Sequence, residues 1–287
     1  MIILHDDLQM CKQEIAANAV LGPDEYIDGE DGLVHCSVCH ERRMSVVKRK
    51  FFQGYFFPRC PCSCQTEEER QRKEQQAKQE RMERIRRRRA HGLRDKSLYQ
   101  YTFDHDDGSN PVMEKARAYV RNWKEAFRKN TGLLLFGDVD TGKSFFAGCI
   151  ANALLDQDVP VLMTSFPTIL NQLTGIYSEE RIDFINSLND YDLLIIDDLG
   201  VERSTEFAME QMFEVIDRRY RSGKPMIITT NLSLEQLRNP SDLAHARIYE
   251  RILELCAPIL FSGENFRKQK SEDNKEAARR IVSSASA

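Results

Sequence analysis

Hydrophobic positions are distributed unevenly along this chain of 287 residues. Between residues 97 and 270, short runs rich in Leu, Ile and Val alternate with longer segments in which apolar residues recur at helical spacing. Short, continuous apolar runs are typical of strands that are buried on both faces, and their alternation with helices favours a parallel sheet. We therefore predict one α/β domain over residues 97–270.

Five of these runs predict strands. They are Leu133–Phe136, Pro160–Thr164, Leu193–Asp197, Met226–Thr230 and Pro258–Phe261. The main predicted helices are Lys143–Leu155, Ser204–Arg221 and Leu243–Cys256, and the segment Phe166–Tyr177 has the apolar spacing of a helix packed on a core. Five strands with intervening helices fit a nucleotide-binding sheet.

Composition separates three further segments. Residues 1–66 hold six of the eight cysteines and include a helix predicted over Leu8–Val20. Residues 67–96 are almost wholly polar, acidic at the start and basic at the end, which suits a helix dipole and predicts a charged, solvated linker helix. Residues 271–287 are charged and then rich in Ser and Ala, so we expect a flexible tail.

The overall charge excludes few classes of partner. The net charge is −4, which gives no global indication of a nucleic-acid partner. No apolar run approaches the length of a membrane span, and the first residues lack the basic and apolar regions of a signal peptide. We expect a cytoplasmic protein without a membrane partner, whose cysteines are better suited to metal binding than to disulfides.

The most specific motif follows the first predicted strand. Gly137-Asp138-Val139-Asp140-Thr141-Gly142-Lys143-Ser144 reads G-x-x-x-x-G-K-S, the pattern of a phosphate-binding loop between a strand and a helix. Backbone N–H groups of such a turn and the N-terminus of the helix form a site for a polyphosphate. We predict that Gly137 to Phe145 bind ATP, with Lys143 on the β- and γ-phosphates and Ser144 on Mg²⁺.

Polar residues at the ends of two later strands fit the same site. Asp197 ends a central apolar strand, where it can hold the Mg²⁺ shared with Ser144, and Asp198 is the candidate to orient the attacking water. Asn231 follows the next strand, where its amide could contact the γ-phosphate and the lytic water. An isolated Asn in such a place is more often a turn residue.

Two arginines lie one helical turn apart in the last predicted helix. Arg247 and Arg251 share one face, which is usually a solvated face. The alternative is an arginine finger that completes the site of a neighbouring subunit. Arg267, just after the last predicted strand, could contact phosphate or a neighbour, and the sequence does not decide between these roles.

The cysteines near the N-terminus have the spacing of a metal site. Cys36-x2-Cys39 is followed by Cys60-x-Cys62-x-Cys64, and tetrahedral Zn²⁺ takes four such thiolates. Which two of Cys60, Cys62 and Cys64 join the first pair stays open, and free buried thiols are the alternative. We thus predict a zinc-binding module over residues 1–66.

The intervening and remaining residues add two structural predictions. Between the two groups of cysteines, Val46-Val47 and Phe51-Phe52 to Phe56-Phe57 predict a two-stranded ribbon that turns near Gly54. Cys11, Cys149 and Cys256 lie in helical patterns and are expected to be packing residues.

Taken in order, the motifs GDVDTGKS, LLIIDD, TTN, RIYERI and GENFR resemble the DnaC/DnaI-like loaders of the replicative helicase, to which the transposition helper IstB is closely related. The resemblance covers about residues 97–268. It implies an AAA+ P-loop NTPase core with a five-stranded parallel sheet, no full lid domain, and ATP-driven head-to-tail self-association. On this resemblance Arg251 is favoured over Arg247 as the finger.

Two residues depart from the family pattern. Asp140 stands where the family usually has the middle glycine of the loop, and it brings a negative charge near phosphate. Asp tolerates unusual backbone angles better than most residues do. Asp198 stands where many AAA+ enzymes have Glu, and its shorter side chain predicts slow, switch-like hydrolysis.

We therefore expect an ATPase that loads a hexameric DnaB-type helicase onto single-stranded DNA, with binding of ATP driving assembly and hydrolysis driving release. The family also implies that a zinc module contacts the helicase and that the element at Phe166–Tyr177 touches DNA. Arg84–Arg89 is the most basic segment, although a basic helix end is equally a solvated face. The alternatives are an IstB-like helper on duplex DNA and a zinc-dependent adaptor that binds ATP without turnover.

Overall fold

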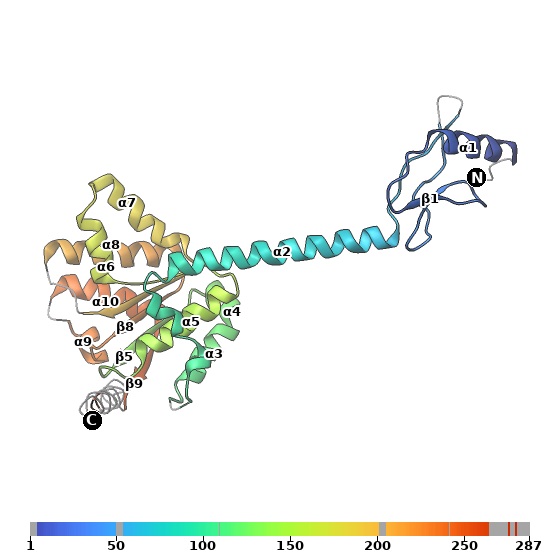
Figure 1. The fold of residues 1–287 in the computed structure, drawn as a ribbon. Helices are drawn as coiled ribbons and strands as arrows, with labels where there is room; N and C mark the ends of the chain where they lie inside the picture. Colours follow the sequence, from blue (N-terminus) through green and yellow to red (C-terminus); the bar gives the residue numbers. More distant parts are fainter. Residues whose placement is uncertain are drawn as a thin grey trace. The chain divides into compact units, whose positions relative to one another are not determined.

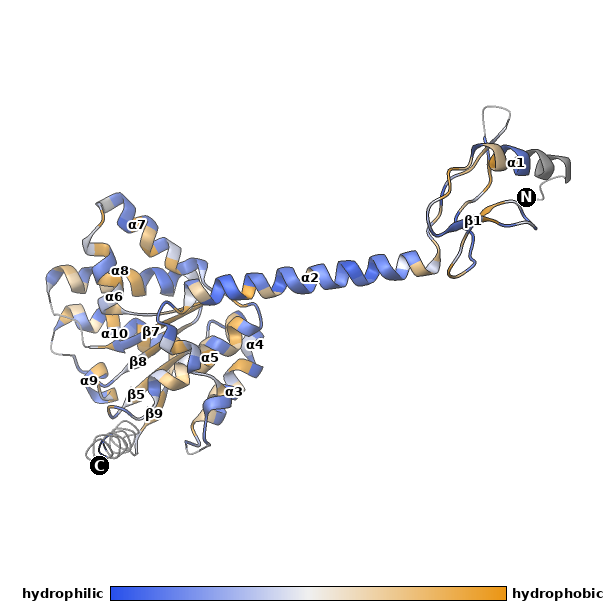
Figure 2. Cartoon of the chain, in the orientation of Figure 1, coloured by the Kyte–Doolittle hydropathy of each residue, from blue (hydrophilic) through white to orange (hydrophobic). Residues whose placement is uncertain are grey.

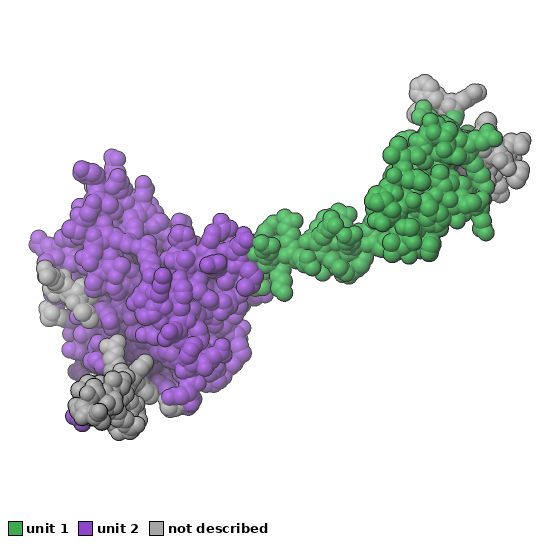
Figure 3. Space-filling view, in the orientation of Figure 1, with its two compact units in different colours: residues 1–81 green, residues 82–287 purple. Residues whose placement is uncertain are grey.

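The computed structural model describes residues 5–49, 54–108, 110–200, 205–240 and 242–263, together with Lys275 and Arg279. The chain divides into two compact units, residues 1–81 and 82–287 (Figure 3). The boundary falls inside the long helix α2 (Ser63–Gly92). Arg267 and nearly all of the predicted tail lie outside the described residues.

The larger unit is built on a parallel sheet of five strands in the order β6–β7–β8–β5–β9. The strands are β5 (Gly132–Gly137), β6 (Val161–Ser165), β7 (Leu193–Leu199), β8 (Met226–Thr230) and β9 (Cys256–Phe261). The predicted five-stranded parallel sheet is therefore confirmed. Pro258 is accommodated because β9 is an edge strand in this order, where a residue without an N–H is tolerated.

Helices cover both faces of the sheet (Figure 1). They are α3 (Met113–Arg121), α4 (Trp123–Arg128), α5 (Lys143–Asp156), α6 (Phe166–Thr174), α7 (Ser178–Ser187), α8 (Glu206–Ser222), α9 (Leu234–Arg238) and α10 (Leu243–Leu255). Short 3₁₀ helices are η1 (Lys96–Gln100), η2 (Phe103–His105) and η3 (Leu188–Asp190).

Alternate residues of each strand feed two separate cores. Leu133 and Leu135 of β5 pack in one apolar cluster with residues of α3 and α5. Leu134, between them, packs in the other cluster with residues of α6, α8 and α10. Because successive side chains of a strand point to opposite faces, this division explains the continuous apolar runs in the sequence.

Strand order also decides which strand ends become neighbours. All five strands are parallel, so their carboxyl ends lie along one edge of the sheet. Since β8 lies between β7 and β5, the residues that follow these three strands are adjacent at that edge. In open α/β sheets this edge is where ligands bind.

Within its described residues, the smaller unit has little apolar interior. It contains α1 (His5–Asn18), the antiparallel pair β1 (Glu25–Ile27) and β2 (Val34–Cys36), and the antiparallel pair β3 (Val47–Lys48) and β4 (Tyr55–Phe56). Its buried cluster consists of Ile15, Leu33, Val34 and Met44. The predicted ribbon is confirmed in its described part, and a core of this size needs further stabilisation from a metal or a partner.

The basic end of α2 has a structural role that the sequence did not show. The helix is hydrophilic along most of its length (Figure 2). Arg84 Nε and Arg88 Nη1 each lie 2.7 Å from a carboxylate oxygen of Asp158, which follows α5. Arg89 pairs with Asp156. Three arginines of the segment considered for DNA are thus engaged in holding the end of α2 on the larger unit.

No helix in the described part of the chain is both long and apolar enough to cross a lipid bilayer.

We predict that Asp158→Asn destabilises the larger unit at neutral pH by about 1 kcal/mol. The hydrogen bond from Arg84, followed by the contacts with Arg88, lowers the pKa of Asp158 to about 2. Since this pKa lies below the ordinary value of 3.8 for Asp, the stabilisation is present above about pH 4 and is lost as the pH falls towards about 2. The difference in unfolding free energy between wild type and variant should shrink over the same range.

Asp156→Asn is the matched control for this measurement. The Asp156 side chain is 61% exposed, against 17% for Asp158, so its ion pair with Arg89 is screened and the loss should be smaller. Equal losses in the two variants, measured by chemical unfolding at several pH values, would refute the anchoring role of Asp158.

Candidate functional site

The loop between β5 and α5 is shaped by three residues with positive φ. The φ angles of Gly137, Asp140 and Gly142 are 126°, 61° and 91°. A Cβ added to Gly137 would lie 2.0 Å from the carbonyl oxygen of Phe261, so only glycine fits where β5 ends beside β9. Asp140 is in the left-handed region, where Asp is enriched over most residues, and this explains how it can replace the family glycine.

Lys143 is folded over this loop. It is only 5% exposed, and its Nζ donates to the carbonyl oxygens of Gly137 at 3.0 Å and Asp138. Thr141 Oγ1 also donates to the Asp138 carbonyl, at 2.8 Å. Burial lowers the pKa of Lys143, while nearby carboxylates, including Asp198, act in the opposite direction. The loop therefore holds a buried cation beside its own backbone carbonyls.

Asp197 is the point at which three elements meet. Its Oδ1 accepts a hydrogen bond from Ser144 Oγ of α5 at 3.0 Å and from Thr229 Oγ1 of β8 at 2.6 Å. Burial raises the pKa of Asp197, and the two hydroxyl hydrogen bonds oppose this rise. Hydroxyl and carboxylate oxygens are ligands that Mg²⁺ prefers, so Ser144 and Asp197 fit a magnesium ion in chemistry and position.

Thr229 is a residue whose role the sequence analysis missed. Besides donating to Asp197, its Oγ1 accepts a hydrogen bond from the backbone N–H of Asp198 at 2.9 Å. Pairing between β7 and β8 is irregular between Ile196 and Leu199, and Asp198 has a φ of 58°. Thr229 thus supports the exposed Asp198 in an uncommon backbone conformation. Only the register of the two strands reveals this contact, and no sequence pattern carries it.

The other predicted nucleotide-site residues lie around this centre. Asn231 is exposed and directly follows β8, between the ends of β5 and β7. Val139 is 57% exposed at the tip of the loop. Phe145, in the first turn of α5, packs edge-on against Tyr101 with ring centroids 5.5 Å apart. The strand ends thus bring Asn231 to the same edge of the sheet as the loop and Asp197.

Arg251 is held within the packing of α8 and α10. Its Nη2 lies 2.7 Å from Oδ1 of Asp217, a residue of α8 whose side chain is 8% exposed. Its guanidinium also stacks over the ring of Phe213, 4.6 Å from the centroid. Arg247, one turn earlier, is exposed. The structure therefore places Arg251 in contacts with α8 and its own helix, and it leaves Arg247 at the surface.

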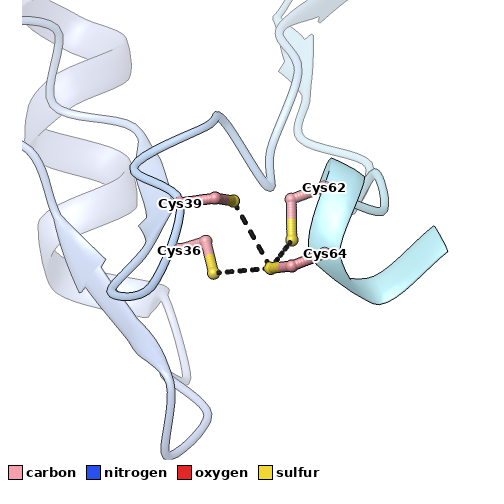
Figure 4. A group of neighbouring side chains, drawn as sticks. All are labelled: Cys36, Cys39, Cys62 and Cys64. Carbon is pink, nitrogen blue, oxygen red and sulfur yellow. Dashed lines mark hydrogen bonds between the residues drawn. The ribbon is translucent and has the colours of Figure 1, made fainter. Parts of the chain in front are cut away.

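Four of the five candidate cysteines form one cluster in the smaller unit. The Sγ atoms of Cys36, Cys39, Cys62 and Cys64 all lie within 4.8 Å of one another (Figure 4). Cys64 Sγ is at the centre, 3.5, 3.4 and 3.2 Å from the Sγ atoms of the other three, in that order. Cys60 lies outside the cluster, and its Sγ donates to the carbonyl of Arg42.

The cluster has the chemistry of a metal site. A hydrogen bond from the backbone of Glu41 lowers the pKa of Cys39 to about 6, which favours the thiolate that binds metal. α2 begins at Ser63, four residues before the predicted linker, so Cys64 lies in its first turn. Four sulfur atoms this close together could hold a tetrahedral metal ion.

Similarity to known proteins agrees with this architecture. The replicative helicase loader DnaI of Bacillus subtilis is 26% identical over 180 residues, which cover 58% of this chain and 58% of DnaI. The loader DnaC of Escherichia coli strain K12 is 28% identical over 170 residues, covering 57% of this chain and 66% of DnaC. The chain therefore matches less than two thirds of the length of either relative.

A crystal structure of DnaI resembles the fold, with a TM-score of 0.51 and 22% identity over 58% of this chain and 94% of that one. The family model described as IstB-like ATP binding protein matches residues 65–274, well over half of the chain. It spans the phosphate loop, Asp197 and the last described strand. This chain belongs to the family of IstB-like ATP binding proteins.

Proposed function

We propose that this chain is an ATPase that loads a hexameric replicative helicase onto single-stranded DNA. The observation that carries the ATPase part is the convergence of Ser144 and Thr229 on Asp197 Oδ1, next to a phosphate-type loop. Support for the loader part comes from the relatives DnaI and DnaC, which are named replicative helicase loaders. No comparable observation favours a transposition helper.

The nucleotide chemistry is assigned to residues of one sheet edge. The loop from Gly137 to Phe145 binds the phosphates of ATP through backbone N–H groups, and Lys143 neutralises charge on the β- and γ-phosphates. Ser144 and Asp197 hold Mg²⁺, which supplies further neutralisation of the phosphate oxygens. Asp198 orients the water that attacks the γ-phosphorus, and Asn231 donates to the γ-phosphate.

Slow turnover follows from how Asp198 is held. Thr229 fixes its backbone N–H, and its side chain is one methylene shorter than that of Glu. A short carboxylate on a fixed backbone has a narrow reach towards the attacking water. Such an enzyme is suited to a switch, in which ATP binding assembles head-to-tail subunits and hydrolysis releases them.

Arg251 is proposed as the residue that completes the site of the next subunit. In this structure its guanidinium is paired with Asp217, so it reaches a neighbour only if this pair opens or is shared. The nearby Arg247 is exposed and is the alternative finger. If Arg251 acts on a neighbouring subunit, mixing two inactive variants can restore activity. If Arg251 only packs α10 against α8, mixing cannot restore it.

Zinc is proposed as the ion held by Cys36, Cys39, Cys62 and Cys64 in the N-terminal module. The module offers a small apolar cluster, so closure by a metal would supply stability that its core does not. The same module is proposed to contact a DnaB-type helicase. Failure of the purified full chain to associate with any such helicase would remove the main support for the loader function.

Lys143→Ala should reduce steady-state ATP turnover by at least about a hundredfold, because the cation that stabilises the phosphates is removed. Arg251→Ala should also lose turnover. Mixing the two variants should restore part of it, since an Arg251→Ala subunit with an intact loop then meets Arg251 of a Lys143→Ala neighbour. Turnover is measured with and without single-stranded DNA.

Each outcome of the mixing experiment has a defined meaning. Full turnover by Lys143→Ala would show that the site is wrongly assigned. No recovery on mixing, together with lower thermal stability of Arg251→Ala, would assign Arg251 to helix packing through Asp217. Arg247→Ala, mixed in the same way, tests the alternative finger: recovery with this variant and not with Arg251→Ala would assign the role to Arg247. Wild-type chain without turnover would instead support an adaptor that only binds ATP.

Asp140→Gly and Asp140→Asn separate the two effects of this residue on ATP binding. Both remove the negative charge and both residues tolerate the left-handed backbone. We expect both to tighten ATP binding, by about tenfold, as measured by titration calorimetry. Tightening in Asp140→Gly alone would show that the backbone angle is limiting, and no change in either would refute an unfavourable charge at this position.

Cys62→Ser should lose bound zinc and lower the melting temperature of the smaller unit, because a serine oxygen is a poor replacement for a thiolate. Cys60→Ser is the control. Because Cys60 lies outside the cluster, this variant should keep its bound zinc. Zinc content per chain and thermal unfolding are the measurements. The ligand assignment is wrong if the two variants retain equal amounts of zinc.

A further inference from the structure

The stretch from Arg42 to Thr66 is unusually basic and aromatic. It has no Asp or Glu, although the whole chain has 45 of them. Its basic residues are Arg42, Arg43, Lys48, Arg49, Lys50 and Arg59. Its aromatic residues are Phe51, Phe52, Tyr55, Phe56 and Phe57. The protein as a whole is acidic, so this local excess of positive charge needs a separate explanation.

In the structure this stretch includes the two antiparallel strands β3 and β4, which form the two arms of a hairpin. Val47 pairs with Phe56 and Lys48 pairs with Tyr55 in antiparallel register. Phe56 is 53% exposed and Val47 is 47% exposed, whereas Phe57 packs against the apolar cluster of the module. These two exposed side chains form a small apolar surface with one large aromatic ring, and the charges around it decide what it can bind.

The positive charges divide into two groups. Arg43 and Arg59 both pair with Glu25, and Arg42 pairs with Asp31, so these three are neutralised within the module. Lys48 and Arg49 are exposed, and neither forms a salt bridge within the described residues. Two uncompensated cations therefore directly follow Val47 in sequence. Phe56 pairs with Val47, and Lys48 pairs with Tyr55 on the other face of the two strands.

We propose that this hairpin, defined by the described residues Val47–Arg49 and Tyr55–Phe56, binds single-stranded nucleic acid. Lys48 and Arg49 contact phosphates, and the ring of Phe56 stacks on an unpaired base. Proteins that bind single strands without sequence preference combine these two features, because every base has a flat face and every nucleotide a charge. The inference rests on the proposed function in naming single-stranded DNA, and it places a contact in the smaller unit.

An acidic protein partner is the competing occupant. It would satisfy Lys48 and Arg49, but it has no need of the exposed flat ring of Phe56 across from Val47. Arms of two residues each also present much less area than the ~800 Å² per partner of a standard protein interface. A strand of nucleic acid, which contacts proteins through one base and one phosphate at a time, fits a surface of this size better.

The test uses the full chain without nucleotide and a fluorescently labelled oligothymidylate, with affinity read by anisotropy. The double variant Lys48→Glu and Arg49→Glu should bind at least about tenfold more weakly. The slope of log affinity against log salt should fall in magnitude by about 1.4, the value for two lost phosphate contacts. Phe56→Ala should weaken binding at least about fivefold, and Phe56→Tyr should bind as the wild type does.

Controls separate stacking from other effects. Phe56→Leu keeps an apolar side chain and loses the flat ring, so it should weaken binding as Phe56→Ala does. Arg72→Glu with Lys73→Glu makes the same change in net charge on α2, where both residues pair with glutamates, and should have little effect. All hairpin variants should retain the ATP turnover and the thermal unfolding of the wild type.

The proposal is overturned if the hairpin variants bind the oligothymidylate as tightly as the wild type. It is also overturned if they keep this binding and lose only association with a helicase, because a protein is then the occupant. Equal binding of duplex DNA, unaffected by Phe56→Ala, would exclude stacking. If the hairpin variants lose DNA binding while the wild type shows no ATP turnover, the proposed enzyme fails and this inference stands.

Discussion

One carboxylate oxygen organises the proposed nucleotide site of this protein. Asp197 Oδ1 accepts hydrogen bonds from Ser144 on α5 and Thr229 on β8, so three elements are joined at a single atom. The carboxylate is half-buried, and its charge would be costly there without these two donors. The start of α5, the end of β7 and the end of β8 are fixed relative to one another by this arrangement, as the proposed hydrolysis of ATP would require.

Sequence patterns predicted most of the residues in this arrangement, but they did not predict the contacts that depend on strand register and helix packing. The apolar run before Asp197 predicted a buried strand ending in a carboxylate, and the loop motif predicted Ser144 beside it. Thr229 was not found, because its contact depends on a register shift between β7 and β8 that no local pattern encodes. Similarly, Arg251 and Asp217 are 34 positions apart in sequence, and only helix packing brings them together.

The sequence also could not decide which cysteines form the metal cluster. Spacing alone could not choose among Cys60, Cys62 and Cys64, because any two of them are close enough in sequence to serve. In the structure Cys62 directly precedes α2 and Cys64 lies in its first turn, and both join the group with Cys36 and Cys39. Cys60, before the turn, bonds instead to the backbone of Arg42. The path of the chain before α2, which spacing does not show, makes the selection.

The glycine at the start of the phosphate loop has a mechanical consequence. Gly137 leaves no space between itself and the carbonyl of Phe261, and the N–H of Asp138 donates to that same carbonyl at 3.1 Å. The start of the loop and the last residue of the edge strand β9 are therefore held together. Any change in loop shape must displace the chain that leaves the sheet at Phe261, or it must break this bond. A movement of the loop would therefore be transmitted to the edge strand β9 through this contact.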